Sequence, residues 1–250
     1  MSWVAAFKAR FYQSWPSVLW HRCVPHWTVS RRMGGYRVFF DLNDNIDDLT
    51  RGDFLAREAF LPFVASRFSG LIWDVGSNIG QFAVPMSGRG CQVVAFDISP
   101  NSCALLERTA RENRLPITVV PRPLGMTPFA FAPPATSRPT EDLQPAAPGD
   151  AAHTAMMIGE AVAAHGMPAL VKMDIEGAER DFFLSNAWRE WIRTNRVHWL
   201  VELHTHRLDM SVVWKDMPML RFDEQHALFH PSPERIAVLG EQWREFLSGK

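Results

Sequence analysis

The sequence predicts an α/β fold in which a mostly parallel, twisted sheet carries helices on both faces, preceded by an N-terminal extension. Three observations support this. The chain has 250 residues, 47% of them apolar and 21% charged, which is enough for one large domain with a packed core. From Leu71 onward, short apolar runs alternate with helical stretches, as in parallel β-α-β units. A glycine-rich turn follows the first of these runs, between Asp74 and Gly80.

Residues 1–52 form the predicted extension. We expect a short helix over 3–13 and a strand over 36–42, after the glycine pair 34–35. The extension is rich in tryptophan, and four of the ten in the chain fall in its first 27 residues: Trp3, Trp15, Trp20 and Trp27. Basic residues break its apolar stretches, and it lacks the features of a signal peptide or a membrane span. With three widely spaced cysteines and no C-x-x-C pair, a cytoplasmic protein without disulfides or a cysteine zinc site is expected.

Residues 53–250 form the predicted main domain, and its first half has a regular rhythm. Apolar spacing predicts helices, and β-branched apolar runs predict strands. In order, we expect a helix over 53–66 with Asp53 as N-cap, a strand in LIWDVG from Leu71, a helix over 79–88, a strand over 91–97, a helix over 100–114 capped by Ser99, and a strand over 117–120.

A proline-rich insert, residues 121–149, interrupts this rhythm. It holds eight of the eighteen prolines, so an irregular segment that covers a substrate is expected rather than a plain connection. The α/β pattern then resumes. We expect a helix over 156–165, a strand over 169–174, a helix over 177–186, a strand over 196–202, and closing strands within 221–229 and 235–239.

The glycine turn reads Asp-Val-Gly-Ser-Asn-Ile-Gly over 74–80. A dinucleotide site would read G-x-G-x-x-G, whereas here an acid precedes a G-x-x-x-G turn. This spacing suits S-adenosylmethionine, which has no pyrophosphate to hold. Backbone amides at the start of the next helix can bind its carboxylate, and Asp74 can hold its ammonium. A tight turn without a ligand is the alternative.

The second predicted strand ends at Asp97, followed by Ile98. An acid at this position can accept both hydroxyls of a ribose, and Ile98 would then lie beside the adenine. An N-cap role for Asp97 is the alternative, although Ser99 suits that role better. The predicted cofactor-binding set is therefore Asp74, Gly76, Ser77, Asn78, Gly80, Phe82, Asp97 and Ile98.

Two later strands deliver polar residues to the same edge of the sheet, because ligands bind at the carboxyl ends of parallel strands. The first ends in VKMDIEGAE, where Lys172 and Asp174 share one face. Glu176 and Glu179 flank a glycine that opens a helix, where acids also favour the helix dipole. Lys172 and Asp174 are predicted catalytic residues.

The second of these strands ends in LVELHTH, so Glu202, His204 and His206 share a face if the chain stays extended. A histidine of near-neutral pKa can take a proton from a hydroxyl, which makes His204 the third predicted catalytic residue. Together with Asp174 the same side chains could instead hold a divalent metal, and a structural His204 is the third alternative. No metal ligand is assigned.

Four segments together resemble the FkbM family of S-adenosylmethionine-dependent methyltransferases: WDVGSNIGQFA, VVAFDISP, VKMDIEGAE and LVELH, in that order between Tyr36 and His206. The resemblance implies a Rossmann-like class I methyltransferase fold and methylation of an oxygen, commonly on a sugar or natural product. By motif, Asp74, Gly76, Asn78 and Gly80 would line the methionine end and Asp97 the ribose. Glu58 stands where the family often carries a glutamate. This chain departs from the family at Asp97-Ile98, where the family usually has Glu-Pro, at Met156-Met157 and in the insert.

The expected reaction is therefore O-methylation of a small-molecule or glycan hydroxyl. N-methylation of a peptide or small-molecule amine, a non-catalytic module that keeps the cofactor fold, and a nicotinamide oxidoreductase are the alternatives. A net charge of -1 predicts no nucleic-acid partner. The tryptophans of the extension would cover the acceptor, join two subunits of a homodimer or contact a membrane surface.

Overall fold

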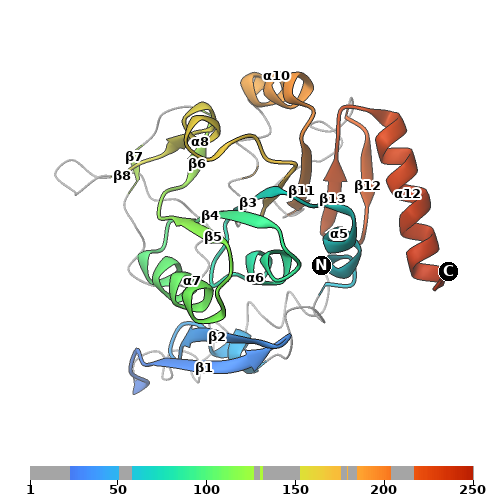
Figure 1. Cartoon of the computed structure of the whole chain (residues 1–250). Helices are drawn as coiled ribbons and strands as arrows, with labels where there is room; N and C mark the ends of the chain where they lie inside the picture. The colour runs from blue at the N-terminus through green and yellow to red at the C-terminus, as the bar shows by residue number, and fades with distance from the viewer. Residues whose placement is uncertain are drawn as a thin grey trace.

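The computed structural model describes residues 23–50, 58–126, 130–131, 153–175, 179, 185–203 and 217–249. Its centre is a seven-stranded sheet in the order β12-β13-β11-β10-β3-β4-β5, in which β13 runs antiparallel to both of its neighbours (Figure 1). The strands are β3 (Leu71–Val75), β4 (Gln92–Phe96), β5 (Ile117–Val120), β10 (Leu170–Met173), β11 (His198–Glu202), β12 (Met219–Arg221) and β13 (His226–Phe229). This is the Rossmann-like class I methyltransferase fold, as predicted.

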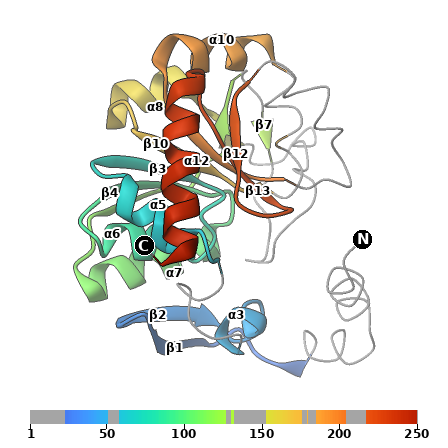
Figure 2. The same cartoon turned by 90° about the vertical axis from the view of Figure 1, so that its right-hand side faces the viewer.

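Helices cover both faces of the sheet. Alternate residues of each strand point to opposite faces, and in β3 these are Ile72 on one side and Trp73 on the other. The Ile72 face packs on α5 (Leu61–Arg67), α6 (Ala83–Ser87), α7 (Pro100–Asn113) and α12 (Pro233–Ser248). The Trp73 face packs on α8 (Ile158–His165) and α10 (Asn186–Asn195). In Figure 2, α12 lies across the near side of the sheet.

The described part of the extension is a hairpin that lies against α7. Strands β1 (Thr28–Met33) and β2 (Tyr36–Asp41) pair to form the hairpin, and the short helix α3 (Ile46–Thr50) follows it (Figure 2). Two side chains of α7 bind the β2 backbone: the amide of Phe39 donates to Thr109 Oγ1 at 3.1 Å and that of Arg37 to Asn113 Oδ1 at 2.8 Å. The expected helix 3–13 lies outside the described residues, and the domain boundary at 52 stays a prediction.

The first strands and helices follow the prediction closely. Strands over 36–42, 71–76, 91–97 and 117–120 are confirmed to within a residue or two, and Ser99 caps α7 by accepting from the amide of Ser102 at 3.2 Å. Of the helix expected over 53–66, the described part begins at Leu61, and residues 58–60 are not helical. Pro62 has no N–H and fits the first turn of a helix. The proposed cap Asp53 lies outside the described residues. The helix expected over 79–88 is likewise shorter, beginning at Ala83.

Three later expectations need correction. Met156–Met157 is not helical but forms β9, paired with β6 (Leu124–Gly125), while β7 (Ala130–Phe131) pairs with β8 (His153–Thr154). Residues 235–239 lie in α12 rather than in a strand, because Ser232 caps a helix with Pro233 in its first turn. The helix α10 was not predicted, and of the helix expected over 177–186 only Glu179 and its last two residues are described.

Among the residues that the structure describes, no helix combines the length and apolar character that a membrane crossing requires.

Candidate active site

The glycine turn between β3 and α6 needs its glycines for two different reasons. Gly76 and Gly80 have φ angles of 76° and 95°, which residues with a Cβ rarely adopt. In addition, a Cβ on Gly76 would overlap the backbone carbonyl of Asp174, and one on Gly80 would lie 2.5 Å from Leu106 Cδ1. The turn is therefore pressed against the carboxyl end of β10 on one side and against α7 on the other.

Asp97 closes this turn from the end of β4. Its Oδ2 accepts a hydrogen bond from the amide of Asn78 at 2.7 Å, and its Oδ1 accepts one from the amide of Ser99 at 2.8 Å. Burial raises the pKa of this carboxyl, against the effect of those backbone donors. Asp97 thus orders the backbone that would contact a cofactor. Its predicted contact with ribose, beside the half-buried Ile98, stays a prediction.

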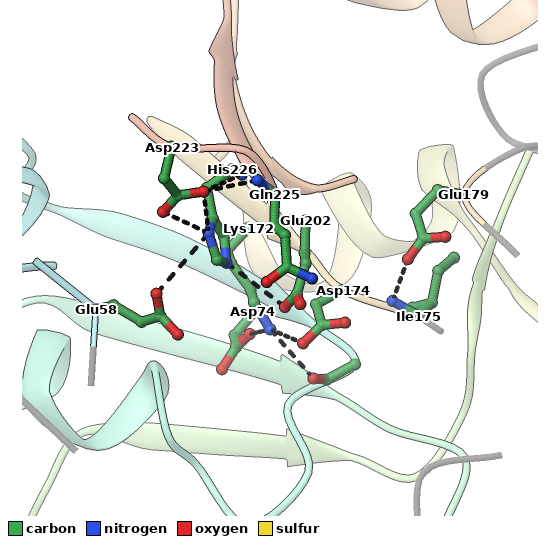
Figure 3. Close-up of polar contacts among 11 residues, drawn as sticks. Glu58, Asp74, Lys172, Asp174, Ile175, Glu179, Glu202, Asp223, Gln225 and His226 are labelled. Carbon is green, nitrogen blue, oxygen red and sulfur yellow. Dashed lines mark hydrogen bonds and ion pairs between the residues drawn. The ribbon is translucent and has the colours of Figure 1, made fainter. Parts of the chain in front are cut away.

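A buried lysine links the turn to the neighbouring strand. The ammonium of Lys172 lies 3.5 Å from Asp74 Oδ1, 3.4 Å from Asp174 Oδ2 and 3.4 Å from the carbonyl oxygen of Gly76 (Figure 3). These contacts follow from the parallel register, in which Lys172 lies beside Asp74. The predicted residues Asp74, Lys172 and Asp174 are therefore brought together.

Charge and burial set the protonation of this group. Burial raises the pKa of the Asp74 carboxyl to about 6, although the nearby Lys172 ammonium lowers it. Burial also lowers the pKa of Lys172, but the carboxylates of Asp174 and Asp74 outweigh it and hold that pKa above its usual range. Lys172 is consequently an ammonium at neutral pH and holds neighbouring carboxylates in place; it cannot accept a proton.

Glu202, at the end of β11, faces a histidine that no sequence motif marks. It lies opposite His226 in the antiparallel register of β11 and β13, with Glu202 Oε2 3.6 Å from His226 Nε2. Burial lowers the pKa of His226, but Glu202, Glu58 and Asp223 outweigh burial and raise it to about 9. His226 is therefore cationic at neutral pH, and the pKa of Glu202 is held below its usual range by His226 and Lys172 against the effect of burial.

These side chains line one pocket at the carboxyl ends of β10 and β11. The pocket has about 520 Å³ of empty space, a figure that includes open solvent. Both apolar and ionisable side chains line it. The lining residues are Glu58, Phe60, Leu61, Gln81, Phe82, Lys172, Asp174, Leu200, Glu202 and His226.

The remaining predicted residues are distributed as follows. Ser77 is buried within the turn, and Phe82 is buried at the start of α6, where it lines the pocket. Glu179 is buried, and its Oε1 accepts a hydrogen bond from the amide of Ile175 at 2.7 Å. This contact is structural, in line with the alternative that an acid near the start of a helix stabilises the helix. His204, His206 and Glu176 lie outside the described residues, so the roles assigned to them stay predictions.

Comparison with known proteins gives matches to solved structures alone: no protein-family model and no curated protein matches the chain. The Pyrococcus abyssi tRNA (uracil-54, C5)-methyltransferase in complex with S-adenosyl-L-homocysteine is 10% identical, with a TM-score of 0.45, over 81% of this chain and 43% of that one. The T. thermophilus 16S rRNA N2 G1207 methyltransferase RsmC, in complex with AdoMet and guanosine, is 13% identical, with a TM-score of 0.46, over 82% of this chain and 50% of that one. Trm5b from Pyrococcus abyssi is 11% identical, with a TM-score of 0.44, over 81% and 54%.

The chain thus spans about half the length of these solved structures. Two of the three were solved with S-adenosylmethionine or S-adenosylhomocysteine, the cofactor that the sequence predicts here. The resemblance to the FkbM family is not confirmed by these matches.

One expectation is corrected. The net charge of -1 predicts no nucleic-acid partner, yet the matched structures include enzymes that methylate tRNA and rRNA. The exclusion was wrong because the summed charge of a chain does not report a local basic surface or the charge of its substrate.

Proposed function

We propose that this chain is a methyltransferase that binds S-adenosylmethionine over the glycine turn and methylates an acceptor in the adjoining pocket. The observation that carries the proposal is the position of Lys172. Its ammonium contacts the glycine turn at the carbonyl of Gly76 and also lines the pocket with Asp174. One buried ion network therefore connects the proposed cofactor site to the proposed acceptor site.

The charges in this network suit the cofactor. Methyl transfer starts from a positively charged sulfonium and requires the acceptor atom, the methyl carbon and the sulfur in line, in a site with little water. Asp74 and Asp174 supply negative charge beside the glycine turn, and Lys172 holds the Asp174 carboxylate in place. Asp74 is fully buried, so its charge acts in a medium of low effective dielectric.

The FkbM resemblance implies an oxygen acceptor, and a hydroxyl must lose its proton during the transfer. Lys172 and His226 are protonated at neutral pH, so they cannot take this proton. Three carboxylates line the pocket beside them, those of Asp174, Glu202 and Glu58. We assign proton acceptance to Asp174, since it lies closest to the glycine turn. The ammonium of Lys172 holds this carboxylate in place. The predicted base His204 remains an alternative.

The test is transfer of a tritiated methyl group from S-adenosylmethionine to acceptors of four classes: carbohydrates, small alcohols, amines and RNA. The purified full chain should label a hydroxyl-bearing class. Asp174→Asn should lower kcat by about 100-fold or more while the affinity for S-adenosylhomocysteine stays within about twofold. Glu112→Gln, at an exposed carboxylate of α7 that pairs with Arg37, is the matched control and should behave as wild type.

Two results would contradict the proposal. If no acceptor class is labelled, the proposed methyl transfer is wrong. If kcat is unchanged in Asp174→Asn, the role of Asp174 as the base is wrong. Labelling of amines alone would replace the oxygen acceptor by a nitrogen one.

A further inference from the structure

A second polar cluster lies at the rim of the pocket and has no role in the mechanism above. It joins three segments that are far apart in the chain: Glu58 before α5, Asp223 in the turn between β12 and β13, and His226 at the start of β13 (Figure 3). His226 Nδ1 lies 2.9 Å from Asp223 Oδ2 and 3.8 Å from Glu58 Oε2. One ligand atom from each residue falls within 4.8 Å of the others.

The histidine ring is fixed from three sides. Its side chain is 10% exposed and packs on the ring of Phe60, with centroids 4.6 Å apart. Nε2 faces Glu202 Oε2 at 3.6 Å, so Nδ1 points to the other two carboxylates. A carboxylate behind the second ring nitrogen is the arrangement that orients histidines bound to metals and strengthens them as donors.

Asp223 is fixed as well. Its Oδ1 accepts hydrogen bonds from the amides of Gln225 and His226, each at 2.7 Å, which orients Oδ2 toward the imidazole. Two of the three donors are thus held in place before any ligand binds, Asp223 by backbone amides and His226 by neighbouring side chains. Preset donors lower the entropy lost on binding.

A comparable cluster elsewhere in the chain shares only some of these features. His26, Asp41 and Asp44 also bring three donor atoms within 4.8 Å, but the His26 side chain is 55% exposed. Asp41 Oδ1 also accepts backbone amides, from Asn43 and Asp44. The described contacts of the His26 ring involve Nδ1, whereas in His226 both ring nitrogens face carboxylates. The second cluster therefore serves as an internal comparison.

We propose that Glu58, Asp223 and His226 bind a divalent transition-metal ion, which displaces the proton on His226 Nδ1, with Glu202 as the carboxylate that orients the histidine. One imidazole nitrogen with two carboxylates suits Mn²⁺, Zn²⁺ and their neighbours better than Mg²⁺ or Ca²⁺, which take oxygen ligands. Three protein ligands leave positions for water or an acceptor. Because Glu58, Glu202 and His226 also line the pocket, the ion would lie at its rim.

The test is titration of the full chain, freed of metals by a chelator, with Mn²⁺, followed by the electron paramagnetic resonance signal of the free ion. No S-adenosylmethionine is added, so the result is independent of the proposed methyl transfer. We expect one saturable site per chain. Glu58→Gln, Asp223→Asn and His226→Gln should each weaken binding by at least about tenfold, and Glu202→Gln by about tenfold.

The matched control is His26→Gln, which should bind Mn²⁺ as the wild type does. Asp223→Asn keeps an oxygen that can accept the two backbone amides, so the turn should persist. If His226→Gln does not fold, Asp223→Asn and Glu58→Gln decide the result. The absence of a saturable site, affinity unchanged in both of these variants, or loss of the site in His26→Gln would overturn the proposal.

Discussion

At the scale of single residues, Asp74 is the side chain whose burial is hardest to explain by stability. It is fully buried, and among the described residues no hydrogen bond reaches either carboxylate oxygen; the ammonium of Lys172 lies 3.5 Å from Oδ1. Burying a charge in this way is unfavourable. Such groups often lie at functional sites, which agrees with the proposed contact to the cofactor ammonium.

This burial predicts a specific pH dependence for Asp74→Asn. A carboxyl with a pKa of about 6 in the folded state and about 4 when unfolded stabilises the protein fully below pH 4 and loses this contribution as the pH rises through 6. The stability of Asp74→Asn relative to wild type should therefore rise between pH 4 and pH 7, by up to about 3 kcal/mol. Urea unfolding of both proteins at the two pH values measures it, and a difference independent of pH would contradict the assignment.

Gly76 and Gly70 provide a matched pair of glycines. Both have positive φ angles, 76° and 82°, but a Cβ on Gly70 would meet nothing within 4 Å, while one on Gly76 would overlap the backbone of Asp174. Gly70→Ala should cost about 1 to 2 kcal/mol through its backbone angle. Gly76→Ala should cost more and should also abolish S-adenosylhomocysteine binding, because the turn must move.

Unfolding free energies and cofactor titrations of the two variants give the comparison. Equal losses of stability, with cofactor binding intact in Gly76→Ala, would show that the close approach has no role.

The residue scale also shows how far the sequence could predict the site. A site at Asp74, Lys172 and Asp174 can be predicted from sequence, because these residues lie in local motifs at the ends of strands. His226 was missed, since its role depends on the antiparallel register that sets it opposite Glu202. Residues 223 and 226 carry no motif that local spacing could reveal.

At the scale of elements, strands were predicted better than helices. The buried parallel strands contain continuous apolar runs such as Val93–Phe96, which are simple to recognise. The helix α10 was missed because its apolar contribution to the core rests on Trp188 and Ile192, one turn apart among polar neighbours. The short apolar run at 235–239 predicts a strand. In the structure, Ile236 and Trp243, which are seven residues apart, instead form one buried face of the helix α12.

The docking of α12 should depend on Trp243. This side chain is 7% exposed and lies 5.1 Å, centroid to centroid, from both Phe63 and Phe222. Trp243→Ala should lower the free energy of unfolding by about 3 to 5 kcal/mol. Val238→Ala, on the same helix at a side chain that is 52% exposed, should change it by less than about 0.5 kcal/mol. Denaturant titration compares them, and similar small effects would mean that α12 is not held by this ring cluster.

At the scale of the whole molecule, the sheet order explains why residues so far apart in sequence meet. The parallel strands β3, β10 and β11 are neighbours, so their carboxyl ends carry Asp74, Asp174 and Glu202 to one edge, and the antiparallel β13 returns His226 to it. The hairpin of the extension packs below α7 (Figure 2). We propose that residues 1–52 are an addition to a methyltransferase domain formed by residues 53–250. The segments around the pocket would then set the specificity for the acceptor.

The central claim is that the glycine turn binds S-adenosylmethionine, and calorimetric titration of the full chain with S-adenosylhomocysteine tests it most directly. NAD serves as the comparison ligand, because the alternative use of a Rossmann-like sheet is to bind a dinucleotide. The account predicts saturable binding of one S-adenosylhomocysteine per chain and no binding of NAD at the same concentrations. Saturable binding of NAD without binding of S-adenosylhomocysteine, or binding of neither, would contradict it.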